Sequence, residues 1–182
     1  MWRDILQADS LLDLLLHFIK RYDESYEDRN TKEMKRRTVV IFPRYHQLRA
    51  VHKLRRLVEE EGVGHNYLIQ HSAGSGKTKT MAWLAHQFTN MIDANGAAVF
   101  DSIIMVTDRI VLNRNMAEDV VNFETTLGTV MDIRKRSKTL ADALNGKNRI
   151  IISTVQKFAY ALDYLKHEQQ KRYAVIIDEA HT

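Results

Sequence analysis

The chain has no cysteine and a single proline among its 182 residues. Without cysteine, neither a disulfide nor a cysteine-ligated zinc can hold the fold together. The most apolar stretch, Leu11 to Ile19, contains Asp13 and His17. It is shorter than the roughly 20 apolar residues that a membrane-spanning helix needs. We therefore expect no membrane contact, and the composition is compatible with a protein of the cytoplasm.

Hydrophobic residues make up 45% of the chain, which is ordinary for a globular domain with its own core. The net charge is +4, a modest excess that is only weak support for a nucleic-acid partner. At this length we expect one domain with a small appendage.

The segment 70–80 has the composition of a phosphate-binding loop between a strand and a helix. Gly74 and Gly76 can adopt backbone angles closed to other residues and leave room for an anion. Successive N–H groups can then surround a phosphate, and Lys77 can reach the β- and γ-phosphates. The Thr78 hydroxyl suits Mg²⁺, which prefers oxygen ligands. A plain glycine–serine turn is the alternative interpretation.

The loop departs from the pattern G-x-x-x-x-G-K-[ST] at its first position, which His71 occupies. That position shapes the approach to the loop, so we expect altered geometry and retained binding. The predicted nucleotide-binding residues within the loop are Ser72, Ala73, Gly74, Ser75, Gly76, Lys77 and Thr78.

Asp178 and Glu179 follow the apolar run 173–177, which is typical of a buried parallel strand. Ligands of open parallel sheets bind outside the carboxyl ends of the strands. Asp178 can hold Mg²⁺ there, and Glu179 can orient and deprotonate an attacking water. Lys77 and Glu179 are thus the predicted catalytic residues. A solvated acidic loop is the alternative.

Strands and helices are predicted to alternate from residue 66 onward, which favours a parallel sheet flanked by helices. The predicted strands are 66–71, 102–107, 149–153 and 173–178, with a further short one at 129–133. The predicted helices are 44–61, 78–91, 109–122, 138–145 and 155–166. Upstream, we expect a helix over 9–27 and a polar connecting loop over 29–37.

These motifs together resemble the first RecA-like domain of superfamily 2 helicases and translocases, and Asp178-Glu179-Ala180-His181 matches their DEAH box. The resemblance implies ATP and Mg²⁺ as cofactors and Gln47 as the residue that recognises adenine. It also implies DNA contacts at positions of two further motifs. These candidates are Thr107, Asp108, Arg109, Thr154 and Gln156; without the family, Asp108 is simply a helix cap, and Thr154 and Gln156 are structural.

More narrowly, the chain is similar to the motor (R) subunit of type I restriction enzymes. The similarity rests on the apolar segment 11–19, on Pro43-Arg44-Tyr45-His46-Gln47, on 71–78 and on Val106-Thr107-Asp108-Arg109. His71 in place of glycine is in keeping with that family. The resemblance implies an ATP-dependent translocase and nuclease acting on double-stranded DNA with methyltransferase (M) and specificity (S) subunits.

We therefore expect an N-terminal helix and linker over 1–37 and a RecA-like ATPase domain over 38–182, truncated after the DEAH box. Alone, such a piece would bind ATP weakly and hydrolyse it slowly. Three alternatives stay open: another superfamily 2 motor such as a type III restriction subunit, a nucleotide-dependent regulatory switch without motor activity, and a small-molecule kinase.

Overall fold

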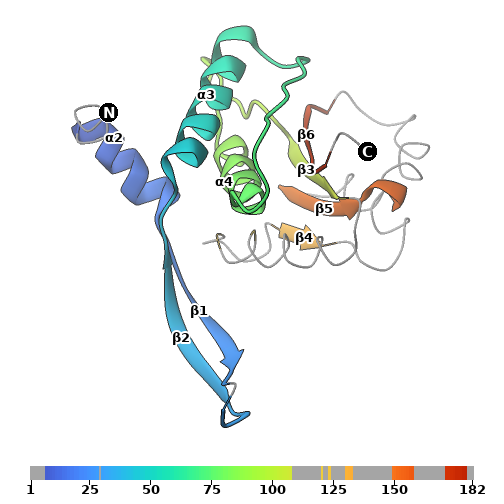
Figure 1. Ribbon diagram of the computed structural model, residues 1–182. Coiled ribbons are helices and arrows are strands. Elements are labelled where there is room, and N and C mark those ends of the chain that lie inside the picture. The colour runs from blue at the N-terminus through green and yellow to red at the C-terminus, as the bar shows by residue number, and fades with distance from the viewer. Residues whose placement is uncertain are drawn as a thin grey trace.

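A four-stranded parallel sheet forms the centre of the protein, in the strand order β4-β5-β3-β6 (Figure 1). The computed structural model describes residues 7–28, 30–107, 120, 123, 130–132, 149–157 and 171–179. The strands are β3 (Ser102–Thr107), β4 (Val130–Asp132), β5 (Ile150–Thr154) and β6 (Tyr173–Ile177). The predictions of strands at 102–107, 129–133, 149–153 and 173–178 are confirmed.

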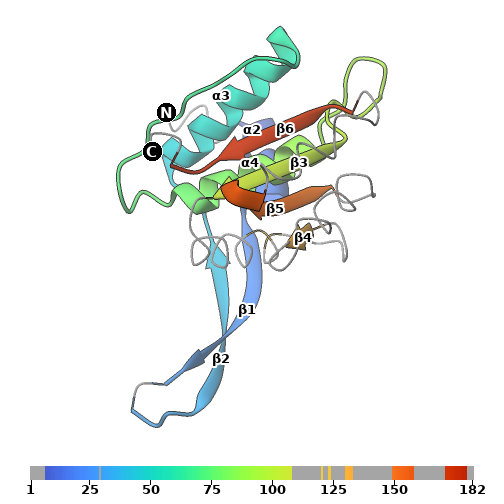
Figure 2. The same cartoon turned by 90° about the vertical axis from the view of Figure 1, so that its right-hand side faces the viewer.

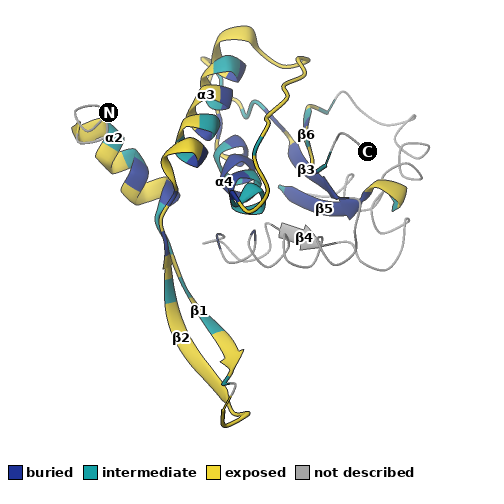
Figure 3. Cartoon of the chain, viewed as in Figure 1, coloured by how far each residue is buried: buried dark blue, intermediate teal, exposed yellow. Residues whose placement is uncertain are grey.

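The two middle strands are buried along their whole length (Figure 3). Their sequences, SIIMVT and IIIST, are nearly continuous β-branched and apolar runs, as strands covered on both faces require. The register pairs Thr107 with Thr154 and Val106 with Ile177. The polar carboxyl ends of β3, β5 and β6 therefore lie next to one another at one edge of the sheet.

Two helices pack together beside this sheet: α3 (Tyr45–Glu61) and α4 (Lys77–Thr89). On α3 the buried positions are Gln47, Val51, Leu54 and Val58, the spacing of one helix face. α4 is buried around most of its circumference, with Trp83 and Ala85 almost inaccessible. The helices predicted at 44–61 and 78–91 are confirmed, and the RecA-like α/β fold with them.

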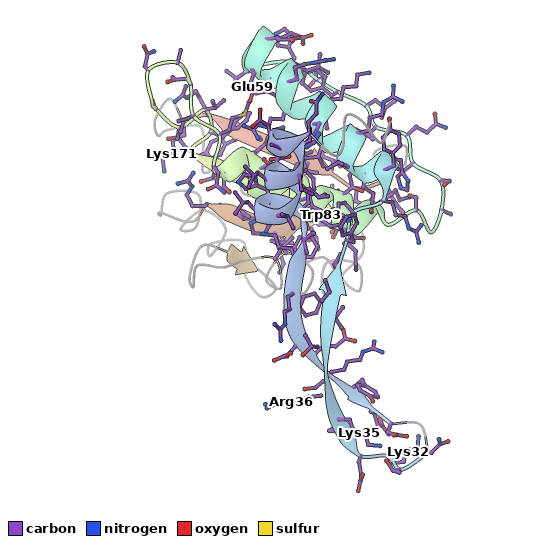
Figure 4. All side chains as sticks on the ribbon, turned by 90° about the vertical axis from the view of Figure 1, so that its left-hand side faces the viewer. Lys32, Lys35, Arg36, Glu59, Trp83 and Lys171 are labelled. Atoms are coloured by element: carbon purple, nitrogen blue, oxygen red, sulfur yellow. The ribbon has the colours of Figure 1, made fainter. Side chains whose placement is uncertain are left out.

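The N-terminal region is only partly helical. Helix α2 (Ala8–Asp13) continues into a wider π-helical segment, η1 (Leu14–Phe18), where the Ile19 N–H donates to the Leu14 carbonyl at 2.9 Å. The chain then forms a long antiparallel hairpin of β1 (Lys20–Glu27) and β2 (Met34–Ile41), which extends away from the body of the protein (Figures 1 and 4).

The hairpin shows that two predictions were wrong: the helix over 9–27 ends at Phe18, and 29–37 is not simply a connecting loop. Side chains that would line a helix surface instead meet across the strands. Thr38 Oγ1 donates to Asp23 at 2.7 Å, and Arg37 bonds Glu24 while lying over the Tyr26 ring. Such cross-strand pairs stabilise a sheet locally. The expected domain boundary after residue 37 lies inside β2.

Residues 66–71 do not form the predicted strand. They run as an extended segment without strand partners among the described residues, and Leu68 is 89% exposed. β6 pairs only with β3 within the described sheet, and its Val175 and Ile177 are exposed. Residues 66–71 thus have the composition of a strand, but no described strand lies beside them to pair with their N–H and C=O groups.

Some predictions fall on residues that the structure does not describe. They are the helices 109–122 and 138–145, of which only Val120 is described as a helical, buried position, and the part of helix 155–166 beyond residue 157. Asp108, Arg109, Ala180 and His181 also lie outside the described residues.

Candidate nucleotide-binding site

The predicted phosphate loop leads directly into α4, which starts at the same end of the sheet as the carboxyl ends of β3 and β6 (Figure 2). Gly74 has φ +70° and Gly76, the N-cap of α4, has φ +85°. Both angles lie in the left-handed region that glycine alone adopts without strain. The sequence prediction that these two glycines shape the loop agrees with this backbone.

Gly76 is needed for space as well as for its backbone angle. A Cβ atom at this position would lie 2.7 Å from Nε2 of Gln47, closer than real contacts allow. A Cβ at Gly74 would meet nothing within 4 Å. The two glycines of the loop therefore have the same conformational requirement and different surroundings.

The first turn of α3 contacts this loop through two adjacent side chains. Gln47 is 3% exposed; its Nε2 donates to the Gly76 carbonyl at 2.9 Å and lies 3.5 Å from the Ser75 carbonyl. Its Oε1 accepts from the Arg44 N–H at 2.9 Å. His46 Nε2 lies 3.1 Å from the Ser75 carbonyl, so this nitrogen must carry a proton and donate.

Both ends of the Gln47 amide are thus engaged with main-chain groups, whereas the sequence resemblance assigned this amide to adenine. The adenine contact stays a prediction. His46 was not among the site residues predicted from the sequence. Its position next to Gln47 at the start of a helix was the available signal, but only the fold brings that turn against the phosphate loop.

The Ser75 side chain is a further feature of the loop that suits a bound ligand. Its Oγ is the one buried side-chain oxygen or nitrogen in the described part of the chain that has no hydrogen-bond partner. Buried polar groups are usually satisfied, so an orphan of this kind needs an explanation. An oxygen-rich anion in the loop would supply the missing partner.

Lys77 and Thr78 occupy the first turn of α4, and both are partly exposed, which would allow either side chain to reach a ligand in the loop. Ser72 and Ala73 are exposed on the preceding part of the loop. The first N–H groups of a helix have no carbonyl partner within the helix, and together with the positive end of the helix dipole they favour a bound anion at the start of α4.

His71, which replaces the first glycine of the loop pattern, lies edge-on to His46 with 5.3 Å between ring centroids. Burial lowers the pKa of His71 below its ordinary 6.5, and electrostatic repulsion from His46 and Lys77 lowers it further. The surroundings of His71 therefore favour its neutral imidazole.

The acidic motif lies at the end of β6. Asp178 is 9% exposed, and its N–H donates to the Val106 carbonyl at 2.9 Å, which extends the pairing with β3 by one bond. Glu179 has φ +54°, an uncommon left-handed angle for a residue with a side chain, and its N–H lies 3.1 Å from Asp178 Oδ1. Backbone strain of this kind collects at functional sites.

The DNA-contact candidates differ in how they are exposed. Thr107 and Thr154 are paired at the ends of β3 and β5, and both are buried. Gln156 is exposed just beyond β5. Of the three, Gln156 alone presents its side chain to solvent in this structure.

Comparisons with known proteins agree with an ATPase fold of this kind. The family described as SWI2/SNF2 ATPase matches residues 46–182. A protein of Methanocaldococcus jannaschii named "Putative type I restriction enzyme MjaVIIP endonuclease subunit" is 28% identical over 171 residues. That alignment covers 86% of this chain and 15% of the relative's length. No helix in the described ranges has both the length and the apolar character needed to cross a membrane.

Proposed function

The chain belongs to the SWI2/SNF2 ATPase family, and on that premise we propose that it carries the ATP-hydrolysing site of the motor subunit of a type I restriction enzyme. The observation that carries the proposal is the pairing of a phosphate loop with an acidic strand end at one edge of a parallel sheet. Type I restriction is proposed because the relative bears that name and its alignment covers 86% of this chain.

In the proposed site, the phosphate loop binds the triphosphate. The left-handed angles at Gly74 and Gly76 turn successive N–H groups toward the anion, and Lys77 adds a full positive charge. Ser75 Oγ, which has no partner among the described residues, would donate to a phosphate oxygen. Ser72 and Ala73 provide the exposed edge of the loop.

Thr78 and Asp178 are the proposed ligands of Mg²⁺, which when bound neutralises charge on the β- and γ-phosphates. One hydroxyl and one carboxylate make a sparse set of protein ligands. No group of three or more histidine or acidic side chains at metal-binding distance occurs in the described ranges. This suits Mg²⁺, which is commonly bound by one or two carboxylates together with substrate phosphates and waters.

Glu179 is the proposed general base. It directly follows Asp178, the proposed metal ligand, and its left-handed backbone angle departs from the extended conformation of β6. In this role it orients water against the γ-phosphate and accepts a proton from it. This division of labour supports hydrolysis over transfer to a second substrate.

We further propose double-stranded DNA as the track of the motor, in a cytoplasmic complex with methyltransferase and specificity subunits. Thr107, Asp108, Arg109, Thr154 and Gln156 are the candidate DNA contacts. The chain spans only 15% of the length of its relative, so DNA cleavage would depend on other parts of a longer protein.

The test is made on the full-length protein assembled with its partner subunits. Lys77→Ala should lower DNA-stimulated ATP hydrolysis by about 100-fold or more, because a preorganised charge on the phosphates is lost. Lys53→Ala, on the exposed face of α3, is the matched control and should leave hydrolysis unchanged. Full activity in Lys77→Ala would refute the site, and hydrolysis indifferent to DNA would favour a regulatory switch over a motor.

A further inference from the structure

The first turn of α3 holds two successive carbonyl groups of the phosphate loop. His46 donates to the Ser75 carbonyl at 3.1 Å, and Gln47 donates to the Gly76 carbonyl at 2.9 Å. The two donors come from neighbouring residues of one helix, and the two acceptors come from neighbouring residues of the loop. The contact therefore holds two consecutive peptide planes, and the second is also held from within α4, where the Thr80 N–H donates to the Gly76 carbonyl at 3.1 Å.

Fixing a carbonyl also fixes the N–H of the next residue. A trans peptide is planar, and its C=O and N–H point in opposite directions. When the Ser75 carbonyl points toward α3, the Gly76 N–H points away from it. When the Gly76 carbonyl points toward α3, the Lys77 N–H likewise points away from α3. These two N–H groups lie at the start of α4, where an anion is expected to bind.

The Gln47 side chain is itself held in place. Its Oε1 accepts from the Arg44 N–H, which leaves Nε2 directed at the loop, and the side chain is almost fully buried. There is no room for even one additional methyl group at Gly76 beside it. A side chain gripped at both ends is suited to positioning a backbone, because little freedom remains to be lost when a ligand arrives.

We propose that His46 and Gln47 are positioning residues that preorganise the phosphate loop. Gln47 then promotes binding of the phosphates of any nucleotide, and its role is not limited to the adenine base. This inference rests on the proposed function and specifies how the same site recognises its ligand. The chemical unit that it recognises is a di- or triphosphate, with or without an attached base.

The experiment uses the full-length protein and three competitors of a fluorescent ATP analogue: ATP, GTP and inorganic tripolyphosphate, which has no base. Gln47→Leu and His46→Leu should each weaken all three competitors by a similar factor, about three- to tenfold for one lost hydrogen bond. His46→Gln, which restores an N–H donor, should recover most of the loss. A merely structural role for the imidazole would not be rescued in this way.

Steady-state hydrolysis gives a second readout. Donors that hold phosphates equally in ground and transition state affect KM and leave kcat nearly unchanged. We expect KM for ATP to rise about as much as binding weakens.

The inference is overturned if tripolyphosphate binds the Leu variants as tightly as it binds the unaltered protein. If Gln47→Leu weakens the binding of ATP but not of GTP or tripolyphosphate, the Gln47 amide recognises adenine instead. Failure of the unaltered protein to bind any of the three would reject the proposed function itself. His46 is exposed, so its variants test the inference even if Gln47→Leu fails to fold.

Discussion

Alanine substitution at Gly76 should destabilise the protein more than the same substitution at Gly74. At both positions φ is positive, so an alanine costs about 1–2 kcal/mol in the left-handed region. The gain from a stiffer unfolded chain is the same for both and cancels in the comparison. What differs is the space, because only Gly76 has Gln47 Nε2 within 2.7 Å of the new methyl group.

The additional cost at Gly76 can be worked from the bonds of Gln47. Moving its amide aside breaks the bond to the Gly76 carbonyl and the longer one to Ser75. Each is worth about 0.5–1.5 kcal/mol, so Gly76→Ala should exceed Gly74→Ala by about 1–3 kcal/mol. Urea unfolding followed by far-UV circular dichroism measures both free energies.

A double variant locates the origin of the difference. Combining Gly76→Ala with Gln47→Ala removes the collision, so the two costs should fall short of additivity by about 1 kcal/mol or more. Equal losses at Gly74 and Gly76, within about 0.5 kcal/mol, would show that the side chain and the loop are not packed as described.

Two further predictions concern the attachment of the N-terminal region. Trp83 is 1% exposed, and its Nε1 donates to the Phe18 carbonyl at 2.8 Å. Trp83→Phe should lower the free energy of unfolding by about 1–3 kcal/mol, because the Phe18 carbonyl loses its donor and packing contacts are lost. Urea unfolding measures this change, and an unchanged free energy would refute the contact. Asp13 accepts from His52 at 2.7 Å and from His17 at 2.8 Å. The His52 bond is the main cause of a pKa below 3.8. A carboxyl group whose pKa is lowered by folding stabilises the folded state at pH values above its unfolded-state pKa. This contribution is lost as the pH falls through the folded-state pKa. Asp13→Asn should therefore be less stable by about 0.5–1 kcal/mol at neutral pH, discounted for partial exposure, and a gap that persists at pH 2 would contradict this.

The sequence was most informative where local pattern and burial agree. The apolar runs of β3 and β5 need a covered environment on both faces, so almost no other structure suits them. The buried stripe of α3 likewise follows from helical spacing, and the glycines of the phosphate loop from their backbone freedom. These features predicted the α/β fold and the edge of the sheet where we propose the site.

The hairpin could not be predicted because its stabilising contacts are not local. Tyr22 and Tyr26 are four residues apart, which also suits one face of a helix, and Glu24 between them is a good helix former. The strand is selected by partners 13 to 15 positions away, including Arg37 and Thr38. The same limit explains residues 66–71, whose composition favours a strand while no partner backbone is present among the described residues.

The hydrogen bonds from α3 to the phosphate loop could not be predicted from the sequence for a related reason. Gln47 and Gly76 are 29 positions apart, and a glutamine before a phosphate loop suggests base recognition when only residue types are compared. Geometry was needed to show which atoms its amide faces.

The hairpin leaves and rejoins the body of the protein at adjacent points, because Lys20 and Ile41 are partners at its base. Tyr22 and Val39 pack against the core, whereas the tip, with Lys32 and Lys35, extends into solvent (Figure 4). The distance between the flanking elements is therefore independent of how long the excursion is. We therefore expect that this arm can be lengthened, shortened or replaced without displacing the proposed nucleotide site, and that its tip can carry a spectroscopic label.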